Sequence, residues 1–338
     1  MKKITIIGGG LGGLALANGL RLADVPVEVM EAGHYPRHRV CGEFMAGLTE
    51  QTIQDLGLKS CFVDALRHST TCFFSKGKAI RTYALPSPVL GISRHTLDLR
   101  MANLVRERGG IVREGVRADL SPGNGIIQTG GNKPKAGGFS GMKGHWGDLE
   151  TRADLEMHMG EHSYVGLSAV ENGDINVCGL FKQIAVGEFG SRLDRFLATL
   201  ERNGLGYLAK RLSKANLRED SLCSVAGLHY NSIRGHFRGT LGDRHRLIPP
   251  FTGNGMTIAI ESAASVLPLA VAYAEGRLAW EQFLEESDTR LREQFAHRYR
   301  TANLLHPFLL SPSLQSILTI LSRARLLPFP ALYKLTHA

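Results

Sequence analysis

The feature that most constrains this chain is its opening, where a short apolar run meets a cluster of glycines. The run Ile4–Ile7 is short and β-branched, which predicts a buried parallel strand. Gly8, Gly10 and Gly13 follow in the spacing G-x-G-x-x-G, and a helical pattern comes after them. In that spacing the first glycine permits a tight turn, the second lets backbone approach a pyrophosphate, and the third lets the helix pack on the strand. The opening therefore predicts a dinucleotide site at a helix N-terminus.

An acidic residue stands where such a site needs one. A second apolar run, Val25–Met30, ends at Glu31, which lies 18 positions after Gly13. An acid about 20 residues beyond the glycines typically binds a ribose hydroxyl. We assign Leu11, which opens the helix, and Ala32, which follows the acid, to the same site. These residues leave NAD and FAD both open.

The composition limits the class of protein. With 338 residues, of which 43% are hydrophobic, the chain can form two closely packed domains. No apolar run is long enough to cross a bilayer, and the β-branched start is unlike a signal peptide, so we expect a cytoplasmic protein. The net charge of +9 fits an anionic cofactor and a membrane-surface contribution from the C-terminus. We expect no nucleic acid partner, because no lysine-rich tract or nucleic-acid motif occurs.

The cysteines and histidines do not form a metal motif. The five cysteines are scattered, and none belongs to a C-x-x-C pair, which argues against zinc and against a disulfide framework. His158 and His162 have no third partner at metal spacing. We therefore expect no metal site.

Periodicity divides the chain into alternating helices and strands. Asn172-Gly173 predicts a two-residue hairpin turn, and Ser93 predicts a helix N-cap. Prolines at 307, 328 and 330 are expected to interrupt the C-terminal helices. Helices are predicted over 11–22, 49–56, 93–109, 193–212, 256–274, 278–305 and 314–327, and strands over 72–74, 79–85, 111–112, 126–128, 154–159, 163–170 and 175–181.

A second glycine stretch lies more than two hundred residues after the first. Gly242-Asp243 is followed by Pro249-Pro250 and then by Thr252–Met256, whose sequence is Thr-Gly-Asn-Gly-Met. An apolar helix is predicted directly after it. Glycines before a helix again expose backbone N–H groups that can face an anion.

With both stretches, the chain resembles the FAD-dependent oxidoreductases related to p-hydroxybenzoate hydroxylase, and within them the geranylgeranyl-reductase-like branch. The resemblance implies that the first stretch and Glu31 bind the adenosine and pyrophosphate, and that Asp243 binds the ribityl chain. It implies that Arg39-Val40-Cys41-Gly42-Glu43 lies beside the flavin ring and that Arg94 lies near the phosphates. The predicted cofactor residues are Gly8, Gly10, Leu11, Gly13, Glu31, Ala32, Arg39, Gly42, Arg94, Asp243, Pro250, Gly253, Asn254, Gly255 and Met256.

The chain departs from the family pattern in three places. Gln128-Thr129-Gly130-Gly131 replaces the usual Gly-Ala-Asp-Gly, and the stretch from Val116 to Ile126 is too short for the usual hairpin or meander. The Trp-x-Trp-x-Ile-Pro segment of halogenases and the Tyr-x-Trp-x-Phe-Pro-Lys segment of prenyl reductases are absent. Halogenation is disfavoured, and specific geranylgeranyl reduction loses support.

Several side chains allow two interpretations. Cys41 is a candidate catalytic proton donor or shaping residue, or a buried small hydrophobe. Glu43 is a candidate catalytic proton relay, or it caps a loop. His145 and Trp146 either contact substrate or pack in the core. Residues 302–335 form either an amphipathic helix at a membrane surface, or a helix packed on the FAD domain or on a dimer partner.

The predicted fold is α/β (α+β), with a three-layer ββα Rossmann-like FAD-binding domain, an inserted antiparallel substrate sheet and a C-terminal helical segment. The domains are 1–70, 92–140 and 225–276 for FAD, 71–91 and 141–224 for substrate, and 277–338 for the helices.

The predicted function is FAD-dependent oxidation of a lipophilic, aromatic or polyketide-like small molecule, by hydroxylation through a flavin hydroperoxide. Flavin-dependent reduction of a carbon–carbon double bond is the alternative, and a non-catalytic flavin- or lipid-binding protein is the second. Electrons would come from transiently bound NAD(P)H or from a separate protein. The substrate is expected under the sheet formed by Lys143–Phe181.

Overall fold

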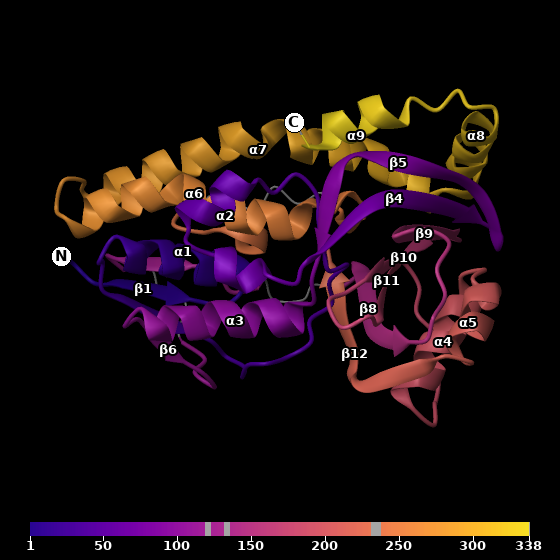
Figure 1. Cartoon of the computed structure of the whole chain (residues 1–338), viewed down its shortest axis with the longest axis horizontal. Helices are drawn as coiled ribbons and strands as arrows, with labels where there is room; N and C mark the ends of the chain where they lie inside the picture. The colour runs from indigo at the N-terminus through magenta and orange to yellow at the C-terminus, as the bar shows by residue number, and fades with distance from the viewer. Residues whose placement is uncertain (119–122, 132–135, 231–237, 338) are drawn as a thin grey trace.

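The chain forms two β-sheets joined to a run of C-terminal helices (Figure 1). The computed structural model describes residues 1–118, 123–131, 136–230 and 238–337. The predicted α/β fold, with a parallel sheet, a large inserted sheet and a helical C-terminal region, is confirmed.

The first sheet, sheet A, is parallel and has the strand order β6-β2-β1-β7. Its strands are short, and the central pair β1 and β2 is almost wholly buried, as expected for a parallel sheet with covered faces. Part of the short stretch before β7, residues 119–122, lies outside the described residues. The elements are β1 (Ile4–Ile7), β2 (Val27–Met30), β6 (Ile111–Arg113) and β7 (Ile126–Gln128), with helices α1 (Leu11–Leu22) and α3 (Arg94–Glu107).

The second sheet, sheet B, has eight strands in the order β12-β8-β11-β10-β9-β4-β5-β3. Its pairs are antiparallel except for β4 and β9, which run parallel. The bounds are β3 (Phe44–Met45), β4 (Leu66–Ser75), β5 (Lys78–Gly91), β8 (Phe139–Gly147), β9 (Leu155–Gly160), β10 (Ser163–Ala169), β11 (Ile175–Phe181) and β12 (Asn216–Leu228), with helices α2 (Glu50–Asp55), α4 (Arg192–Arg202) and α5 (Gly206–Leu212).

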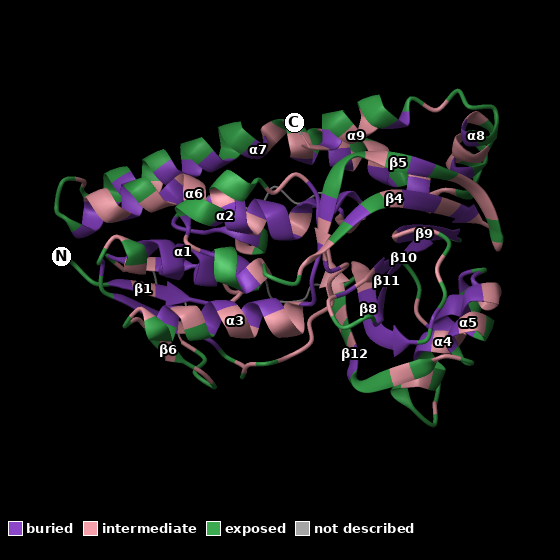
Figure 2. Cartoon of the chain, in the orientation of Figure 1, coloured by how far each residue is buried: buried purple, intermediate pink, exposed green. Residues whose placement is uncertain are grey.

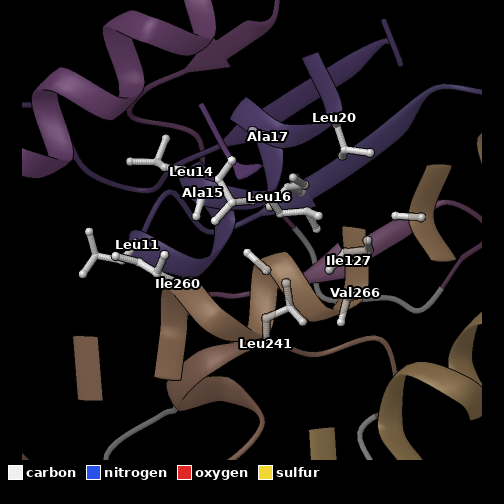
Figure 3. Close-up of a cluster of buried hydrophobic side chains, with 14 of the residues drawn as sticks. Leu11, Leu14, Ala15, Leu16, Ala17, Leu20, Ile127, Leu241, Ile260 and Val266 are labelled. Atoms are coloured by element: carbon white, nitrogen blue, oxygen red, sulfur yellow. The ribbon is translucent and has the colours of Figure 1, made fainter. Parts of the chain in front are cut away.

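The largest core joins sheet A to α1 and to the later helix α6 (Asn254–Ala274). Figure 3 shows Leu14, Leu16 and Leu20 of α1 facing the same cluster as Ile260 and Val266 of α6. Each of these side chains is at most 1% exposed, and each such burial contributes about 1.5–3 kcal/mol. This packing fixes both helix N-termini relative to each other.

A separate core lies between sheet B and helices α4 and α5. Successive side chains of β8 point to opposite faces of the sheet. Met142 and Trp146 therefore pack in this core, while Lys143 and His145 lie on the other face. Both faces of β8 are covered, so most of the strand is buried (Figure 2).

The C-terminal helices cover sheet B and the α1–α6 core. In Figure 1 the long helix α7 (Trp280–Leu310) runs beside α6, whereas α8 (Pro312–Arg323) and α9 (Phe329–His337) lie over β5. Among the described residues, one helix, α6, is long and apolar enough to cross a membrane, as is the bent pair α7 and α8 if taken as one span, so the expectation that no apolar run has this length was wrong. The apolar window of α6 is 56% buried inside the structure, as in the core helix of a globular protein.

Three predicted boundaries need correction. Pro307 does not end its helix, which continues to Leu310; the helix loses the one hydrogen bond that the missing N–H would have made, and the buried His306 and Leu309 hold the last turn in place. The single helix predicted over 193–212 is two helices, separated where Gly204 takes a positive φ of 73°. Strand β12 was not predicted, since its exposed polar residues hide the alternation. Sheet B includes β3, the start of β4 and the end of β12, which lie within residues 1–70 and 225–276; the domain bounds themselves stay a prediction.

Candidate functional site

The first glycine turn joins β1 to α1 and has the geometry that its spacing predicts. Gly8 has a φ of 110°, and a Cβ there would collide with the backbone of Gly130. A Cβ on Gly13 would collide with the carbonyl oxygen of Gly8, so this glycine lets the helix meet the turn. Gly10, the N-cap of α1, has open space where its Cβ would be. Of the three glycines, Gly10 is therefore the one with room beside it for a ligand.

Glu31 lies directly after β2, beside this turn. Its carboxylate accepts hydrogen bonds from the backbone N–H groups of Gly9 and Gly33, at 2.8 and 2.9 Å, and from Arg37 at 2.6 Å. Burial alone would raise its pKa, but Arg39, the Gly33 amide and Arg37 together hold the pKa below its usual value. The acid is therefore a carboxylate that can accept hydrogen bonds at neutral pH. Ala32 follows it and lines neither of the cavities described below.

A cavity of about 400 Å³, here called the cleft, lies between sheet B and the two glycine turns. It receives the N-terminus of α1 at Gly10 and the N-terminus of α6 at Gly253. The N-terminus of a helix attracts negative charge, so both ends of the cleft suit anionic or electron-rich groups. The predicted cofactor residues that line the cleft are Gly10, Leu11, Arg39, Gly42, Arg94, Asp243, Pro250, Gly253, Gly255 and Met256.

The second glycine turn is as tightly constrained as the first. Gly253 has a φ of 71°, and a Cβ there would press against the ring of Phe44. Asn254 does not line the cleft, because its side chain is buried and donates to the carbonyl of Thr336 in α9 at 2.7 Å. Thus Asn254 ties the turn to the last helix, while Gly253 and Gly255 face the cleft.

Charged side chains line the cleft between the two turns. Arg94 donates two hydrogen bonds to Asp98, at 2.7 and 2.8 Å, and Arg39 donates a third at 2.9 Å. Asp243 is an exposed residue of the cleft wall; desolvation by the surrounding protein raises its pKa, although Arg94 acts in the opposite direction. Arg94 thus lies between two acids, one anchoring it and one in the cleft wall.

The loop that carries Cys41 is clamped onto sheet B. Asn176 Nδ2 donates to the carbonyls of Cys41 and Gly42, at 3.1 and 2.8 Å, and Ser168 Oγ donates to Gly42 at 2.7 Å. Cys41 and Gly42 both line the cleft. Sequence reasoning missed Asn176 and Ser168, since isolated polar residues in a strand carry no local pattern.

Glu43 anchors the same loop from inside the protein. Its side chain is 0% exposed, and its backbone has a φ of 56°, which is uncommon for a residue other than glycine. Its carboxylate accepts from the N–H of Arg94 and from Lys143 Nζ, each at 2.9 Å, and lies 2.5 Å from His145 Nε2. Burial would raise its pKa, but Lys143 and His145 lower the pKa to about 2. This geometry supports the loop-anchoring interpretation of Glu43.

Glu43, His38 and His145 lie close enough to hold a metal ion by spacing. The ammonium of Lys143, however, already contacts Glu43 Oε1 at 2.9 Å and His38 Nδ1 at 3.1 Å. A cation placed among the three ligands would be opposed by this buried positive charge. The group is therefore better described as an ion-pair network.

Cys41 presents its side chain to the cleft while remaining a thiol. Burial raises the pKa of this thiol above its usual value, with Arg94 acting in the opposite direction. The N–H of Glu43 donates to Sγ at 3.5 Å. The side chain is therefore a neutral group that can donate a proton into the cleft, and thiolate chemistry is not favoured.

The two predicted substrate residues lie away from the cleft. Trp146 is 0% exposed and packs on Phe196 of α4, with ring centroids 5.7 Å apart. His145 is held by Glu43, behind the Cys41 loop. Neither residue lines the two cavities, which matches the core-packing alternative.

A second cavity, here called the apolar chamber, was not foreseen from the sequence. It has a volume of about 360 Å³ and lies between sheet B and helices α7, α8 and α9. Its wall comes from segments far apart in the sequence, which no local pattern connects. The chamber and the cleft share four wall residues: Phe44, Met157, Gly166 and Phe251.

Neither a protein-family model nor a curated protein sequence matches this chain. Several solved structures, however, match this chain. The p-nitrophenol 4-monooxygenase PnpA of Pseudomonas putida DLL-E4 superposes with a TM-score of 0.76 at 13% identity, over 99% of this chain and 97% of that one. A geranylgeranyl bacteriochlorophyll reductase-like protein of Thermoplasma acidophilum gives 0.72 at 16% identity, over 99% and 96%. The flavin-dependent brominase Bmp2 gives 0.71 at 15% identity, over 98% of each chain. The fold of this chain is therefore the one that these three proteins share.

Proposed function

We propose that this protein is an FAD-dependent oxidoreductase that hydroxylates an apolar small molecule. The main observation behind the proposal is that the N-termini of two helices, α1 and α6, both face one cleft. A glycine turn precedes each of these helices. The fold shared with the p-nitrophenol 4-monooxygenase PnpA and with the flavin-dependent brominase Bmp2 supports it. When bound, FAD supplies the redox chemistry, and the protein supplies position, exclusion of water and protons.

The residues that line the cleft fit the pyrophosphate and the flavin end of FAD. Gly10, with no neighbour where a Cβ would be, leaves space for a pyrophosphate at the N-terminus of α1. Glu31 lies beside this turn as a carboxylate, but it is 4% exposed and its oxygens already accept from Gly9, Gly33, Arg37 and Arg39, so a ribose hydroxyl would have to replace one of these donors. At the other end, the N-terminus of α6 and its backbone N–H groups from Gly253 onward can stabilise negative charge on a flavin ring. Asp243 would hold the chain between these ends.

Purification tests the cofactor directly. The protein should be yellow, or should bind added FAD, and heat should release FAD rather than FMN. Asp243→Ala should weaken FAD binding by about tenfold or more, since a hydrogen bond to a charged group is lost. Asp55→Ala, at an exposed position on α2, is the matched control. A colourless protein that takes up no FAD would end the proposal.

Reduction of a carbon–carbon double bond is the second candidate, and Cys41 favours it. A neutral thiol in the cleft wall is placed to give a proton to a substrate that accepts a hydride. If the reaction is a reduction, Cys41→Ala should abolish turnover. If the reaction is a hydroxylation, the same variant should keep most of its activity. Labelled oxygen separates the two: product carrying the label indicates hydroxylation, and product that gains only hydrogen indicates reduction. Running the assay with and without NAD(P)H tests whether a nicotinamide is the electron donor.

We also propose that the C-terminal helices touch a membrane surface. Ile320 and Leu326 are 65% and 69% exposed, and they lie near the exposed Arg323 and Arg325. Apolar and basic side chains together favour an anionic bilayer surface. The protein should float with phosphatidylglycerol vesicles, and Ile320→Glu with Leu326→Glu should abolish flotation. If the wild-type protein does not float, this proposal is wrong.

A further inference from the structure

The apolar chamber lies next to the cleft. Phe44, Met157, Gly166 and Phe251 border both cavities, so the two cavities meet at these four residues. Gly166 is one of these four, and an added Cβ there would meet only two carbonyl oxygens, each at 3.9 Å. The boundary between the two cavities is therefore thin on this side.

The chemistry of the chamber differs from that of the cleft. Its wall is almost entirely apolar, with leucines and phenylalanines from sheet B, α7, α8 and α9. The one acid in its wall, Glu156, is already bound by the N–H of Arg152, by His158 and by Arg211. The chamber therefore offers little to a polar head group, but it suits hydrocarbon.

The size of the chamber limits what can fill it. A water molecule occupies about 30 Å³ of liquid, and a methylene group is of similar size, so 360 Å³ corresponds to about twelve such groups. A chain of on the order of ten carbons would fit, whereas a small ring alone would leave much of the space empty.

The roof over the chamber is fastened rather than loosely packed. In α9, the carbonyl of Thr336 accepts from Asn254 Nδ2 at 2.7 Å, and His337 Nε2 lies 2.9 Å from the carbonyl of Thr252. These bonds attach the roof to the same turn that opens α6 toward the cleft. The position of the roof is thus fixed by the fold, and the chamber lies beside the reacting end of the cleft.

We propose that the apolar chamber binds an aliphatic chain of the substrate, while the part of the substrate that reacts lies in the cleft. The inference rests on the proposed function for its reacting end, but chain binding itself can be measured without turnover. The substrate class is a molecule with a ring or polar head and a saturated or lightly unsaturated tail of about ten carbons.

The test uses the full-length protein and a homologous series of saturated fatty acids from four to fourteen carbons. Each acid displaces 11-(dansylamino)undecanoic acid, and fluorescence reports the displacement. Affinity should rise about fourfold for each added methylene and level off near ten to twelve carbons. Equal affinity across the series, or no displacement at all, would overturn the proposal.

Two neighbouring leucines of α7 provide a matched pair of variants. Leu305 lines the chamber, whereas Leu304 is 72% exposed. Leu305→Trp should move the plateau to shorter acids and weaken binding of the longest ones at least about fourfold, the effect of one methylene. Leu304→Trp should match the wild type. Leu318→Trp, on α8, fills the chamber from another side and serves if Leu305→Trp does not fold.

Flavin content, measured on the same samples, separates the two proposals. Protein that lacks FAD but shows the chain-length dependence would contradict the proposed function and support the chamber. Protein that holds FAD but binds all acids alike would contradict the chamber alone.

Discussion

The ion pair that holds the Cys41 loop makes a prediction about stability and pH. The carboxylate of Glu43 is fully buried and has a pKa of about 2, against an ordinary value of 4.5. A pKa that is lower in the folded protein means stabilisation that is present above pH 4.5 and lost as the pH falls toward 2. At about 1.4 kcal/mol for each pH unit, this difference corresponds to about 3 kcal/mol. Glu43→Gln should therefore lower the free energy of unfolding by about 3 kcal/mol at pH 7.

Urea denaturation, followed by circular dichroism at pH 7 and at pH 3, measures this effect. The gap between wild type and Glu43→Gln should shrink at pH 3, because the wild-type carboxylate has lost much of its advantage there. Glu50→Gln, at a position where the side chain is 85% exposed, controls for the loss of a negative charge. A gap that is the same at both pH values, or a variant as stable as the wild type at pH 7, would refute the assignment of Glu43 as a charged anchor.

Three further predictions follow from the turn and the clamp. Gly13→Ala should destabilise the fold by about 1–3 kcal/mol, because its Cβ would meet the backbone of Gly8; thermal unfolding measures this. Gly10→Ala should fold normally, because no atom lies near its Cβ, but should lose about tenfold or more in FAD affinity; flavin titration shows whether it does. Asn176→Ala should cost about 1–3 kcal/mol and speed alkylation of Cys41 by iodoacetamide, followed by peptide mass spectrometry, since two carbonyls of the loop lose their donor.

Local patterns predicted the parts of the fold that depend on neighbouring residues. The strand Ile4–Ile7 and the helix Leu11–Leu22 have the bounds that the sequence indicated, because glycine spacing and apolar periodicity act over a few residues. The N-cap at Ser93 is confirmed for the same reason, since its side chain accepts from the N–H of Thr96. A hairpin turn does join β10 and β11 here, but it has three residues rather than the predicted two: Val170 bonds to Asp174, and of Asn172 and Gly173 only Gly173 has a positive φ.

Features that depend on contacts across the chain could not be predicted in this way. Whether Trp146 faces a ligand or a core depends on which face of β8 is covered by α4, and the sequence of β8 alone does not show this. The ion pair between Glu43 and Lys143 joins residues a hundred positions apart. Pro307 was expected to end a helix, but the helix continues to Leu310, where burial of His306 and Leu309 outweighs the lost backbone bond. The apolar chamber depends on the packing of α8 and α9 over sheet B, which periodicity cannot supply.

The attachment of α9 to the turn before α6 has a consequence for folding. The chamber needs β3, from the early part of the chain, and His337 to be in place together, so it forms only when these distant contacts have formed. Such non-local contacts are slow to assemble, and the unfolded chain has no chamber to offer. A ligand that binds the native state alone stabilises it by mass action. The melting temperature of this protein should therefore rise with the concentration of a long-chain acid, and short acids should leave it unchanged.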